Sequence, residues 1–289
     1  MNILITGANG FIGKNIVEKW IDKYKLFFPS SKELNLLNLN DVKDFLKKNS
    51  IDIVIHSAKI DEVNRPNISK YEVLDYNLRM FFNLAYCKHM YKKMIYFGSG
   101  AEYNRKDMPK YVKENYVCKT IPEDPYGFAK YVMNKYTLQS SNIYNFCLFG
   151  VFGKYEEYRR RFISNNICRS IKGLQMTLTQ DIEFDYLYID DLIRILEWAI
   201  VNDLKYHKYN VCSGKAVRLS TVGKIISEVI GDRNGVIIKN VGMQVPYVGS
   251  NIQLLEEIGD FTYTDLKISI YELFQYYYSI KDSIVKDEL

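Results

Sequence analysis

The sequence of 289 residues lacks several features that would place it in a class at once. No hydrophobic run reaches the roughly 18 residues that a membrane-spanning helix needs. Its three histidines and five cysteines are scattered, and no two cysteines form a C-x-x-C pair, so no metal site is expected. An odd number of dispersed cysteines indicates reduced thiols in the cytoplasm. A strand pattern starts directly after Met1, so we expect no signal peptide.

The charge is mild and well mixed. There are 39 basic and 34 acidic residues, and the net charge is +5. Because no dense basic run is present, we expect no nucleic-acid binding, whereas the small positive excess suits an anionic small ligand. Hydrophobic residues make up 47% of the chain, which is ample for a large core.

The first half of the chain alternates strand and helix patterns. We expect strands at 2–6, 25–28, 51–56, 93–98 and 143–149, and helices at 11–20, 41–48, 71–88 and 126–138. This alternation predicts an α/β fold, a Rossmann-type doubly wound parallel sheet with helices on both faces. Residues 1–150 are assigned to an NAD(P)-binding domain, to which later segments around 184–212 return. Residues 151–289 are assigned mainly to a smaller α/β C-terminal substrate lobe.

The second half gives weaker signals. We expect a loop at 150–158, a helix from Arg161, a strand at 184–191 that leads into a helix at Leu192, and another strand at 208–211. Ser220 and the segment 261–264 are expected to cap the helices that follow them.

A glycine-rich turn follows the first strand. Gly7 allows the tight turn, Gly10 lets a pyrophosphate approach the backbone, and Gly13 lets the helix pack on the strand. The helix would also offer its N-terminal N–H groups to phosphate. We expect the whole turn to bind the cofactor: Gly7, Asn9, Gly10, Phe11, Ile12 and Gly13.

The end of the second strand bears on the choice between NADP and NAD. An acidic residue there would bind the ribose hydroxyls of NAD. Here Ser30, Ser31 and Lys32 precede the first acid, Glu33, and these groups could hold a 2′-phosphate. NADP(H) is therefore favoured and NAD(H) stays possible. In the alternative interpretation this segment is only a solvated turn that Glu33 caps.

Tyr126 and Lys130 stand one helical turn apart, downstream of Ser99. A tyrosine hydroxyl has a pKa of about 10 in water and needs a nearby cation to transfer a proton near neutrality. Lys130 can supply that cation and bind the nicotinamide ribose, and Ser99 can donate a hydrogen bond to a substrate carbonyl. A Y-x-x-x-K match by chance is common in a chain with 25 tyrosines. The lead-in Asp124-Pro125 and the position after a glycine turn favour the catalytic interpretation.

Seven segments together resemble the extended short-chain dehydrogenases/reductases, the nucleotide-sugar epimerases, dehydratases and 4-ketoreductases. They are Thr6–Gly13, Ile55–Ala58, Asn77, Phe97–Tyr103, Asp124–Lys130, Phe149–Gly153 and Tyr186–Asp191. The resemblance implies a catalytic set of Ser99, Tyr126 and Lys130, and a lobe that grips a nucleoside-diphosphate sugar. We further place Asn38, Ser57, Ala58 and Asn77 at the cofactor, and Gly100, Arg161 and Asn165 with Ser99 at the substrate. We also expect a homodimer.

Departures from the family pattern narrow the reaction. Dehydratases of this family carry Thr-Asp-Glu where this chain has Ser99-Gly100-Ala101, so 4,6-dehydration is not expected. Enzymes that form GDP-fucose need a cysteine and a histidine where this chain has Ala101 and Tyr155. Phe184 replaces an arginine that is frequent before the late Asp-Tyr, and Arg159, Arg160 or Arg161 could contact the diphosphate instead.

These observations predict an NADP(H)-dependent reductase of a nucleotide-linked 4-keto sugar. The alternative within the family is a 4-epimerase that retains NAD tightly. A rival from another class is a catalytically idle dinucleotide-binding protein, against which the intact set of Ser99, Tyr126 and Lys130 argues.

Overall fold

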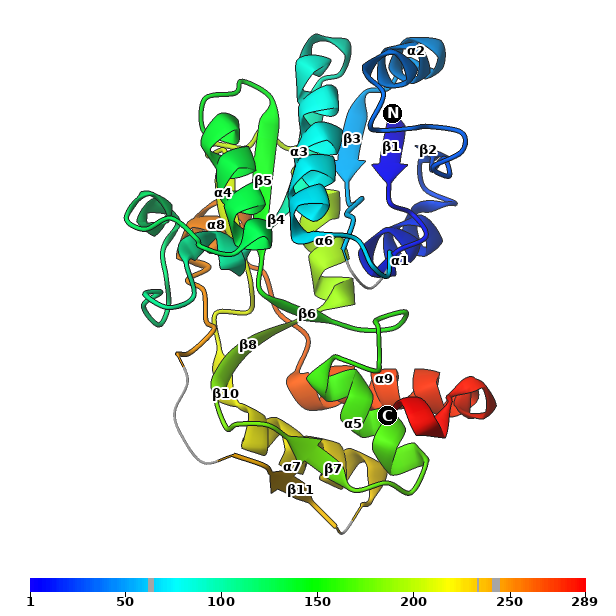
Figure 1. Cartoon of the computed structure of the whole chain (residues 1–289), viewed down its shortest axis with the longest axis vertical. Helices are drawn as coiled ribbons and strands as arrows, with labels where there is room; N and C mark the ends of the chain where they lie inside the picture. Colours follow the sequence, from blue (N-terminus) through cyan, green and yellow to red (C-terminus); the bar gives the residue numbers. More distant parts are fainter. Residues whose placement is uncertain (62–64, 233, 241–244) are drawn as a thin grey trace.

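The computed structural model describes residues 1–61, 65–232, 234–240 and 245–289. The chain forms a larger body that contains the N-terminus and a smaller body that contains the C-terminus (Figure 1). A short three-stranded sheet lies where the chain passes between them.

The larger body is built on a parallel sheet of six strands. Their order across the sheet is β2 (Lys25–Phe27), β1 (Asn2–Thr6), β3 (Ile53–His56), β4 (Lys93–Ser99), β5 (Ile143–Leu148) and β9 (Lys208–Val211). The inner strands are almost wholly buried, as their runs of branched apolar residues require when helices cover both faces. The chain leaves β1 toward β2 and then crosses to β3, so the direction of winding changes between β1 and β3. Ligands of doubly wound sheets bind at such a point.

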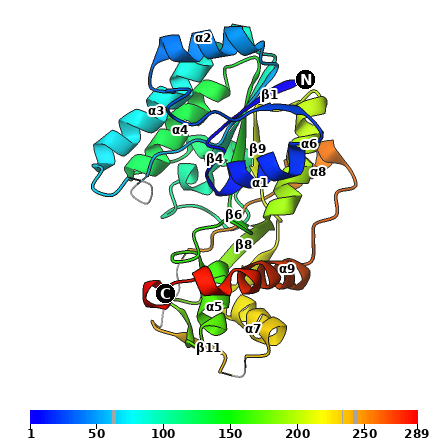
Figure 2. The ribbon, with the colours of Figure 1, turned by 90° about the vertical axis from the view of Figure 1, so that its right-hand side faces the viewer.

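Helices cover both faces of this sheet (Figure 2). On one face, α1 (Phe11–Trp20) and α6 (Ile189–Val201) form a core with side chains that include Ile3, Ile5 and Leu192. On the other face, α2 (Leu39–Asn49), α3 (Lys70–Tyr86) and α4 (Pro125–Thr137) pack on the alternate residues of the same strands, such as Leu4 and Val54. The predicted fold class is confirmed.

The smaller body packs three helices around its own core, which includes Ile167, Ile226 and Leu273. These helices are α5 (Phe162–Ile171), α7 (Leu219–Ile230) and α9 (Leu266–Ser279). Beside them lies a two-stranded sheet of β7 (Met176–Leu178) and β11 (Val236–Ile238). The sheet between the bodies holds β6 (Gly150–Phe152), β8 (Glu183–Tyr188) and β10 (Ala216–Arg218). The remaining helices are α8 (Ile252–Ile258), η1 (Lys88–Met90), η2 (Gly100–Tyr103), η3 (Glu114–Cys118), η4 (Lys281–Ser283) and η5 (Lys286–Glu288).

Four local predictions for the second half were wrong. The segment expected as a loop at 150–158 contains β6, which pairs with β8. Helix α6 begins at Ile189 instead of Leu192, because the acidic residues Asp190 and Asp191 suit a first helical turn.

The two predicted caps were also displaced. Ser220 does not cap α7, since Arg218 is the N-cap and the Ser220 hydroxyl donates to Asp181 at 2.8 Å. Helix α9 is capped by Asp265 and not by the segment 261–264. In both places the hydroxyl that was expected to cap the helix donates to a carboxylate far away in the sequence. Ser220 donates to Asp181, and Thr264 donates to Asp191.

Within the described ranges, none of the helices combines the length and the apolar character needed to span a bilayer. Cys87, Cys147, Cys168 and Cys212 are buried and form no disulfide. The boundary near residue 150 between a cofactor domain and a substrate lobe stays a prediction.

Candidate active site

The glycine turn lies at the point where the sheet changes direction. Gly7 has a φ of +71°, and a Cβ there would come within 2.6 Å of the backbone of Ala58. Gly13 is held as closely against the turn, because a Cβ would collide with the backbone of Gly7 and Ala8. Both glycines are therefore required by packing inside the protein.

Gly10 differs from its two neighbours. It is exposed, its φ is −83°, and a Cβ there would meet only the carbonyl oxygen of Gly7, at 3.3 Å. Within the described part of the chain no side chain caps α1, and its first turn carries no acid. The cradle that a Cβ at Gly10 would partly fill, beside the N–H groups of Phe11, Ile12 and Gly13, fits the pyrophosphate of a dinucleotide. Asn9 is exposed beside it.

The end of β3 packs against the glycine turn. Ser57 and Ala58 are half-buried there, and the Ala58 N–H donates to the Thr6 hydroxyl at 3.3 Å. The same hydroxyl lies 2.8 Å from Nδ1 of His56. Burial, and secondarily the charge of Lys130, lowers the pKa of His56 to about 3, so this ring is neutral at ordinary pH.

Two asparagines predicted at the cofactor have structural partners. Asn77 is buried, and its amide donates to the carbonyl oxygens of Ile60 at 2.7 Å and Val73 at 2.6 Å. It fastens the segment after β3 to α3. Asn38 caps α2, where its side-chain oxygen accepts from Asn40 and Asp41. Their contact with the cofactor stays a prediction, and these bonds leave both amide hydrogens of Asn77 engaged.

The segment after β2 is a turn closed by Glu33. Its carboxylate accepts from the backbone N–H and the hydroxyl of Ser30, both at 2.8 Å. These two bonds hold the pKa of Glu33 below its ordinary value. The Ser30 hydroxyl is thus engaged within the turn, whereas Ser31 and Lys32 are exposed and accessible to a ligand.

Ser99 ends β4 and begins η2. Its hydroxyl oxygen accepts from the N–H of Ala101 at 3.2 Å. Helix α4 begins close to it with Pro125 in its first position, and the Asp124 carboxylate caps the helix by accepting from Gly127 N–H at 2.8 Å. A Cβ at Gly127 would lie 2.8 Å from the carbonyl oxygen of Ala101. Because α4 packs this closely on η2, the first turn of α4, which carries Tyr126, lies beside the segment that carries Ser99.

Lys130 lies one turn further along α4 and is buried. Its ammonium donates to the carbonyl oxygen of Phe97 at 2.7 Å and lies 5.8 Å from the centre of the Tyr126 ring. Burial lowers the pKa of Lys130, and the interaction with Tyr126 opposes this effect. A cation held between β4 and Tyr126 can stabilise the phenolate that forms when Tyr126 gives up its proton.

A buried ion pair that the sequence analysis did not identify joins η2 to β9. Glu102 and Lys208 are both almost fully buried, and their charged atoms are 2.5 Å apart. The amide of Asn145 donates to both Glu102 oxygens, at 3.2 and 3.1 Å, and to Asn134 of α4 at 2.9 Å. This network joins η2, which directly follows Ser99, to α4, β5 and β9. The only sequence signal was an acid, Glu102, at a position between apolar neighbours.

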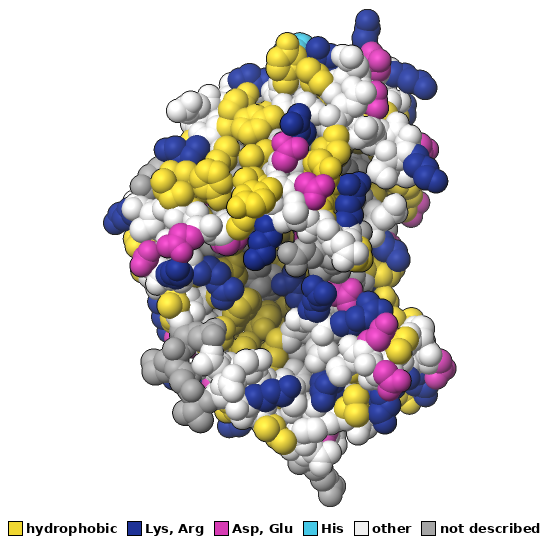
Figure 3. Space-filling model, viewed as in Figure 1, with side chains coloured by type: hydrophobic (Ala, Val, Ile, Leu, Met, Phe, Trp, Pro, Cys, Tyr) yellow, Lys and Arg dark blue, Asp and Glu magenta, His cyan; other side chains and the backbone are white. Residues whose placement is uncertain are grey.

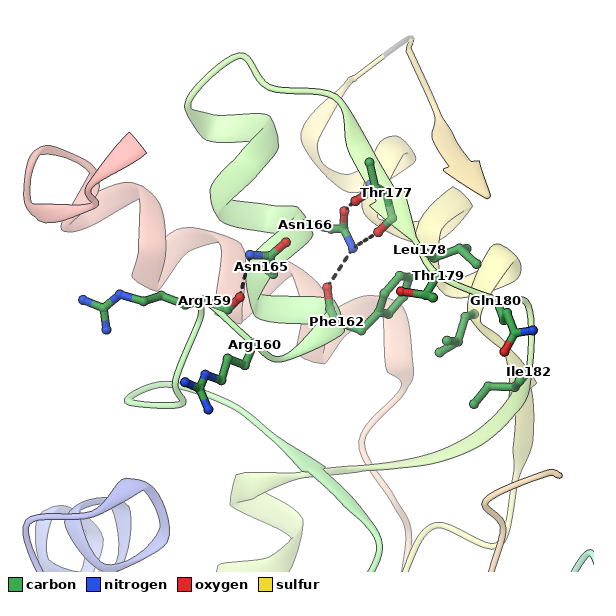
Figure 4. A pocket seen from close by; sticks show the side chains of 11 residues that line it. Arg159, Arg160, Phe162, Asn165, Asn166, Thr177, Leu178, Thr179, Gln180 and Ile182 are labelled. Carbon is green, nitrogen blue, oxygen red and sulfur yellow. Dashed lines mark hydrogen bonds between the residues drawn. The ribbon is translucent and has the colours of Figure 1, made fainter. Parts of the chain in front are cut away.

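The smaller body contains a pocket of about 390 Å³ beside the start of α5 (Figure 4). Asn165, predicted at the substrate, lines it together with Arg159 and Arg160. Arg161, also predicted there, is not among the lining residues; its Nε lies 3.8 Å from the buried carboxylate of Glu156. The space-filling view shows a hollow between the two bodies with an apolar floor and basic side chains around its edge (Figure 3).

The described residues contain no group of three or more His, Cys, Asp or Glu side chains placed to hold a metal ion.

Comparison with known proteins places this arrangement in a family. Residues 3–212 match the family described as "NAD dependent epimerase/dehydratase family". The chain belongs to this family. The predicted resemblance is confirmed, and the chain is an enzyme of this NAD(P)-dependent family.

Individual relatives agree with the family over nearly the whole chain. The GDP-L-colitose synthase of Yersinia pseudotuberculosis is 27% identical over 98% of this chain and 100% of its own length. A GDP-L-fucose synthetase from Naegleria fowleri, solved with NADP, has a TM-score of 0.84 at 21% identity and covers 99% of this chain and 94% of its own. A GDP-mannoheptose C4 reductase from Campylobacter jejuni, also solved with NADP, has a TM-score of 0.80 at 18% identity, with coverage of 96% and 98%. Both solved structures share the fold of this chain.

Proposed function

We propose that the protein reduces the 4-keto group of a nucleoside-diphosphate deoxysugar with NADPH. The observation that carries the proposal is the junction of β4, η2 and α4, where Ser99, Tyr126 and the buried Lys130 come together. Support comes from relatives named as synthases of GDP-linked sugars and from a solved neighbour named as a C4 reductase.

Three side chains have separate roles in the reduction. Tyr126 donates its proton to the carbonyl oxygen, and Lys130 stabilises the resulting phenolate. Ser99 donates a hydrogen bond to the same oxygen as negative charge develops on it. When bound, the nicotinamide supplies the hydride to C4. The turn from Gly7 to Gly13 holds the pyrophosphate. Tyr126 is only half-buried, so its hydroxyl is accessible to the substrate.

The nucleoside diphosphate is assigned to the pocket of the smaller body. Arg159 and Arg160 lie on the segment that leads into α5, and their side chains extend away from the helix (Figure 4). Arg159 also pairs with Glu157 and Glu288. We therefore assign the diphosphate contact to Arg160 and a polar contact to Asn165. Arg161 faces Glu156 and is not assigned to the substrate.

A panel of 4-keto-6-deoxyhexoses linked to GDP, UDP, ADP and dTDP tests the function. With NADPH present, one member should be reduced at C4 with one NADPH consumed per sugar. Because Ala101 carries no acid and Tyr155 directs its hydroxyl to Glu18 at 2.9 Å, the product formed in deuterium oxide should carry no enzyme-dependent label at C3 or C5.

Two results would contradict the proposal in different ways. Enzyme-dependent deuterium at C3 or C5 would show proton abstraction beside the ketone, which this assignment does not provide for. Interconversion of two 4-epimers without added cofactor would instead identify a 4-epimerase with retained NAD.

A further inference from the structure

The short helix η2 begins directly after Ser99 and sets the orientation of its hydroxyl. Ser99 is the N-cap of η2, and its side-chain oxygen accepts from the Ala101 N–H at 3.2 Å. A serine hydroxyl has one hydrogen to donate and two lone pairs with which to accept. Because the Ala101 N–H occupies one lone pair, the direction in which Ser99 can donate depends on where η2 holds Ala101.

A buried carboxylate fixes this part of η2 to the sheet. Glu102, which follows Ala101, is fully buried. Its carboxylate lies 2.5 Å from the ammonium of Lys208 on β9, and it accepts from the amide of Asn145 on β5 at 3.2 and 3.1 Å. Asn145 and Lys208 stand opposite each other in the register of the two strands, so their side chains project from the same face of the sheet. Glu102 is thus tied to two neighbouring strands at once.

The last residue of η2 is anchored to the same strand, β9. The Tyr103 hydroxyl donates to the side chain of Asn210 at 2.5 Å, and the Lys208 ammonium lies 3.9 Å from the centre of the Tyr103 ring. Asn210 is fixed in turn, because its amide donates to the carbonyl oxygens of Val112 and Ser250. Lys208 and Asn210 alternate along β9 and therefore face η2 together.

The first residue of η2 is packed just as closely. Gly100, which the sequence analysis placed at the substrate, is buried. A Cβ there would lie 2.6 Å from the Tyr247 hydroxyl and 2.9 Å from the ring of Phe149. Its contact with the substrate stays a prediction, but the packing confines η2 at the end where Ser99 is attached.

A buried ion pair is better suited to fixing geometry than to adding stability. Apolar side chains of similar size often stabilise a protein as well or better, because they avoid the desolvation cost of two charges. The Glu102 carboxylate, by contrast, must meet both the Lys208 ammonium and the Asn145 amide, so few positions of η2 satisfy it.

We propose that Glu102, held by Lys208 and Asn145, is a positioning residue for the reduction. It fixes η2, and with it the Ala101 N–H that orients the Ser99 hydroxyl toward the substrate carbonyl oxygen. This inference rests on the proposed function.

The variant that tests it combines Glu102→Leu with Lys208→Met, which removes both charges and leaves no charge buried without its partner. With NADPH and a GDP-linked 4-keto-6-deoxyhexose, kcat should fall roughly 10-fold. This is less than the roughly 10²–10³-fold worth of a donor to a developing oxyanion, because the Ser99 hydroxyl is misaligned and not lost. KM and the Kd for NADPH should stay nearly unchanged.

A second variant tests the anchor itself. Glu102→Gln combined with Lys208→Met returns an acceptor for the Asn145 amide, so its kcat should lie between that of the first variant and that of wild type. The matched control is Lys93→Met, which removes a buried lysine from the opposite end of β4, where the ammonium donates to two carbonyl oxygens near the end of α6. The control should lower the free energy of unfolding and leave kcat unchanged.

A double-mutant cycle separates positioning of Ser99 from a merely structural role. Added to Ser99→Ala, the Glu102→Leu and Lys208→Met changes should lower kcat by no more than about 2-fold, because no hydroxyl remains to be oriented. Equal fold-losses with and without the Ser99 hydroxyl would overturn the inference, as would a normal kcat for the Glu102→Leu, Lys208→Met variant. Normal turnover of Ser99→Ala alone would instead refute the catalytic assignment in the proposed function.

Discussion

At the residue scale, the site depends on a few groups whose neighbours set their chemistry. Lys130 is buried yet bonded to the Phe97 carbonyl oxygen, so its charge is fixed in place next to Tyr126. The pKa of His56 is lowered mainly by burial and secondarily by this cation, so His56 is neutral. The two groups show how one buried region can retain one charge and exclude another.

The first prediction concerns the proton donor. Tyr126→Phe should lower kcat by roughly 10²–10⁴-fold, because general acid catalysis is worth about that much. The Kd for NADPH, measured by fluorescence titration, should change little, since only one hydroxyl is lost. Tyr131→Phe, on the same helix, serves as the control. A Tyr126→Phe enzyme with near-normal turnover would show that another group supplies the proton.

The second prediction concerns cofactor choice. Lys32 and Ser31 are exposed after β2, so Lys32→Ala should weaken NADPH binding and leave NADH binding unchanged. The loss should be on the order of 0.5–1 kcal/mol, as for an exposed charge pair. Isothermal titration with both cofactors measures it, with Lys48→Ala on α2 as the control. Equal losses for both cofactors would refute a role in binding the 2′-phosphate.

At the scale of elements, two sets of contacts fix η2 relative to α4. In the first, Gly127 allows α4 to approach the Ala101 carbonyl oxygen. In the second, the Glu102–Lys208 pair and Asn145 join η2 to β9, β5 and α4. A buried pair of this kind fixes geometry at a high desolvation cost, so its loss should show in stability.

The third prediction tests that pair. Lys208→Met should lower the free energy of unfolding by about 3–5 kcal/mol, because it leaves Glu102 buried without its cation. The double variant Glu102→Leu with Lys208→Met should recover most of the loss in urea unfolding. Recovery should be incomplete, because the Asn145 amide loses the two Glu102 oxygens that accept from it and keeps only its bond to Asn134.

An exposed pair provides the control for this comparison. Lys267 and Glu228 lie 2.7 Å apart with side chains 58% and 59% exposed. Lys267→Met should cost less than about 1 kcal/mol. If Lys208→Met cost no more than that, the buried pair would not hold η2 in place.

At the scale of the whole molecule, the segment after β6 carries the chain into the smaller body. Glu156 is buried there, and it accepts from the Ser164 hydroxyl at 2.6 Å. Arg161 faces it, and Glu157 and the half-buried Tyr186 lie nearby. Burial raises the pKa of Glu156 to about 8, against the opposing effects of Ser164 and Arg161.

The fourth prediction follows from this shift. Below pH 4.5 Glu156 is protonated in both the folded and unfolded chains, and above pH 8 it is ionised in both. Between these values the folded chain retains a proton that the unfolded chain loses, so stability falls as the pH rises, by at most about 1.4 kcal/mol per pH unit.

Unfolding of wild type and Glu156→Gln from pH 4 to 9 measures this effect. The stability of Glu156→Gln relative to wild type should increase through the window and become constant above it. Glu157→Gln, the partly exposed neighbour paired with Arg159, is the control. A difference between wild type and Glu156→Gln that does not depend on pH would contradict the shift.

Much of the larger body could be predicted from the sequence, because local chemistry decides its elements. Buried apolar runs form β1, β3, β4 and β5, and the glycine turn after β1 admits few other structures. The proposed catalytic set could be named because Tyr126 and Lys130 share one face of one helix. The predicted positions at 150–158, Ser220 and 261–264 failed because the partners that decide those segments, β8, Asp181 and Asp191, lie far away in the sequence.

The sequence by itself determined the fold class and the family, and it named the residues proposed to transfer a proton, since each depends on short segments whose spacing is fixed by strand and helix geometry. Only the tertiary structure decided which groups surround those residues. Lys208 reaches Glu102 across 106 residues of chain, and Tyr247 reaches Gly100 across 147. Contacts of this kind are set by burial and packing in the finished sheet, and no local pattern in the chain records them.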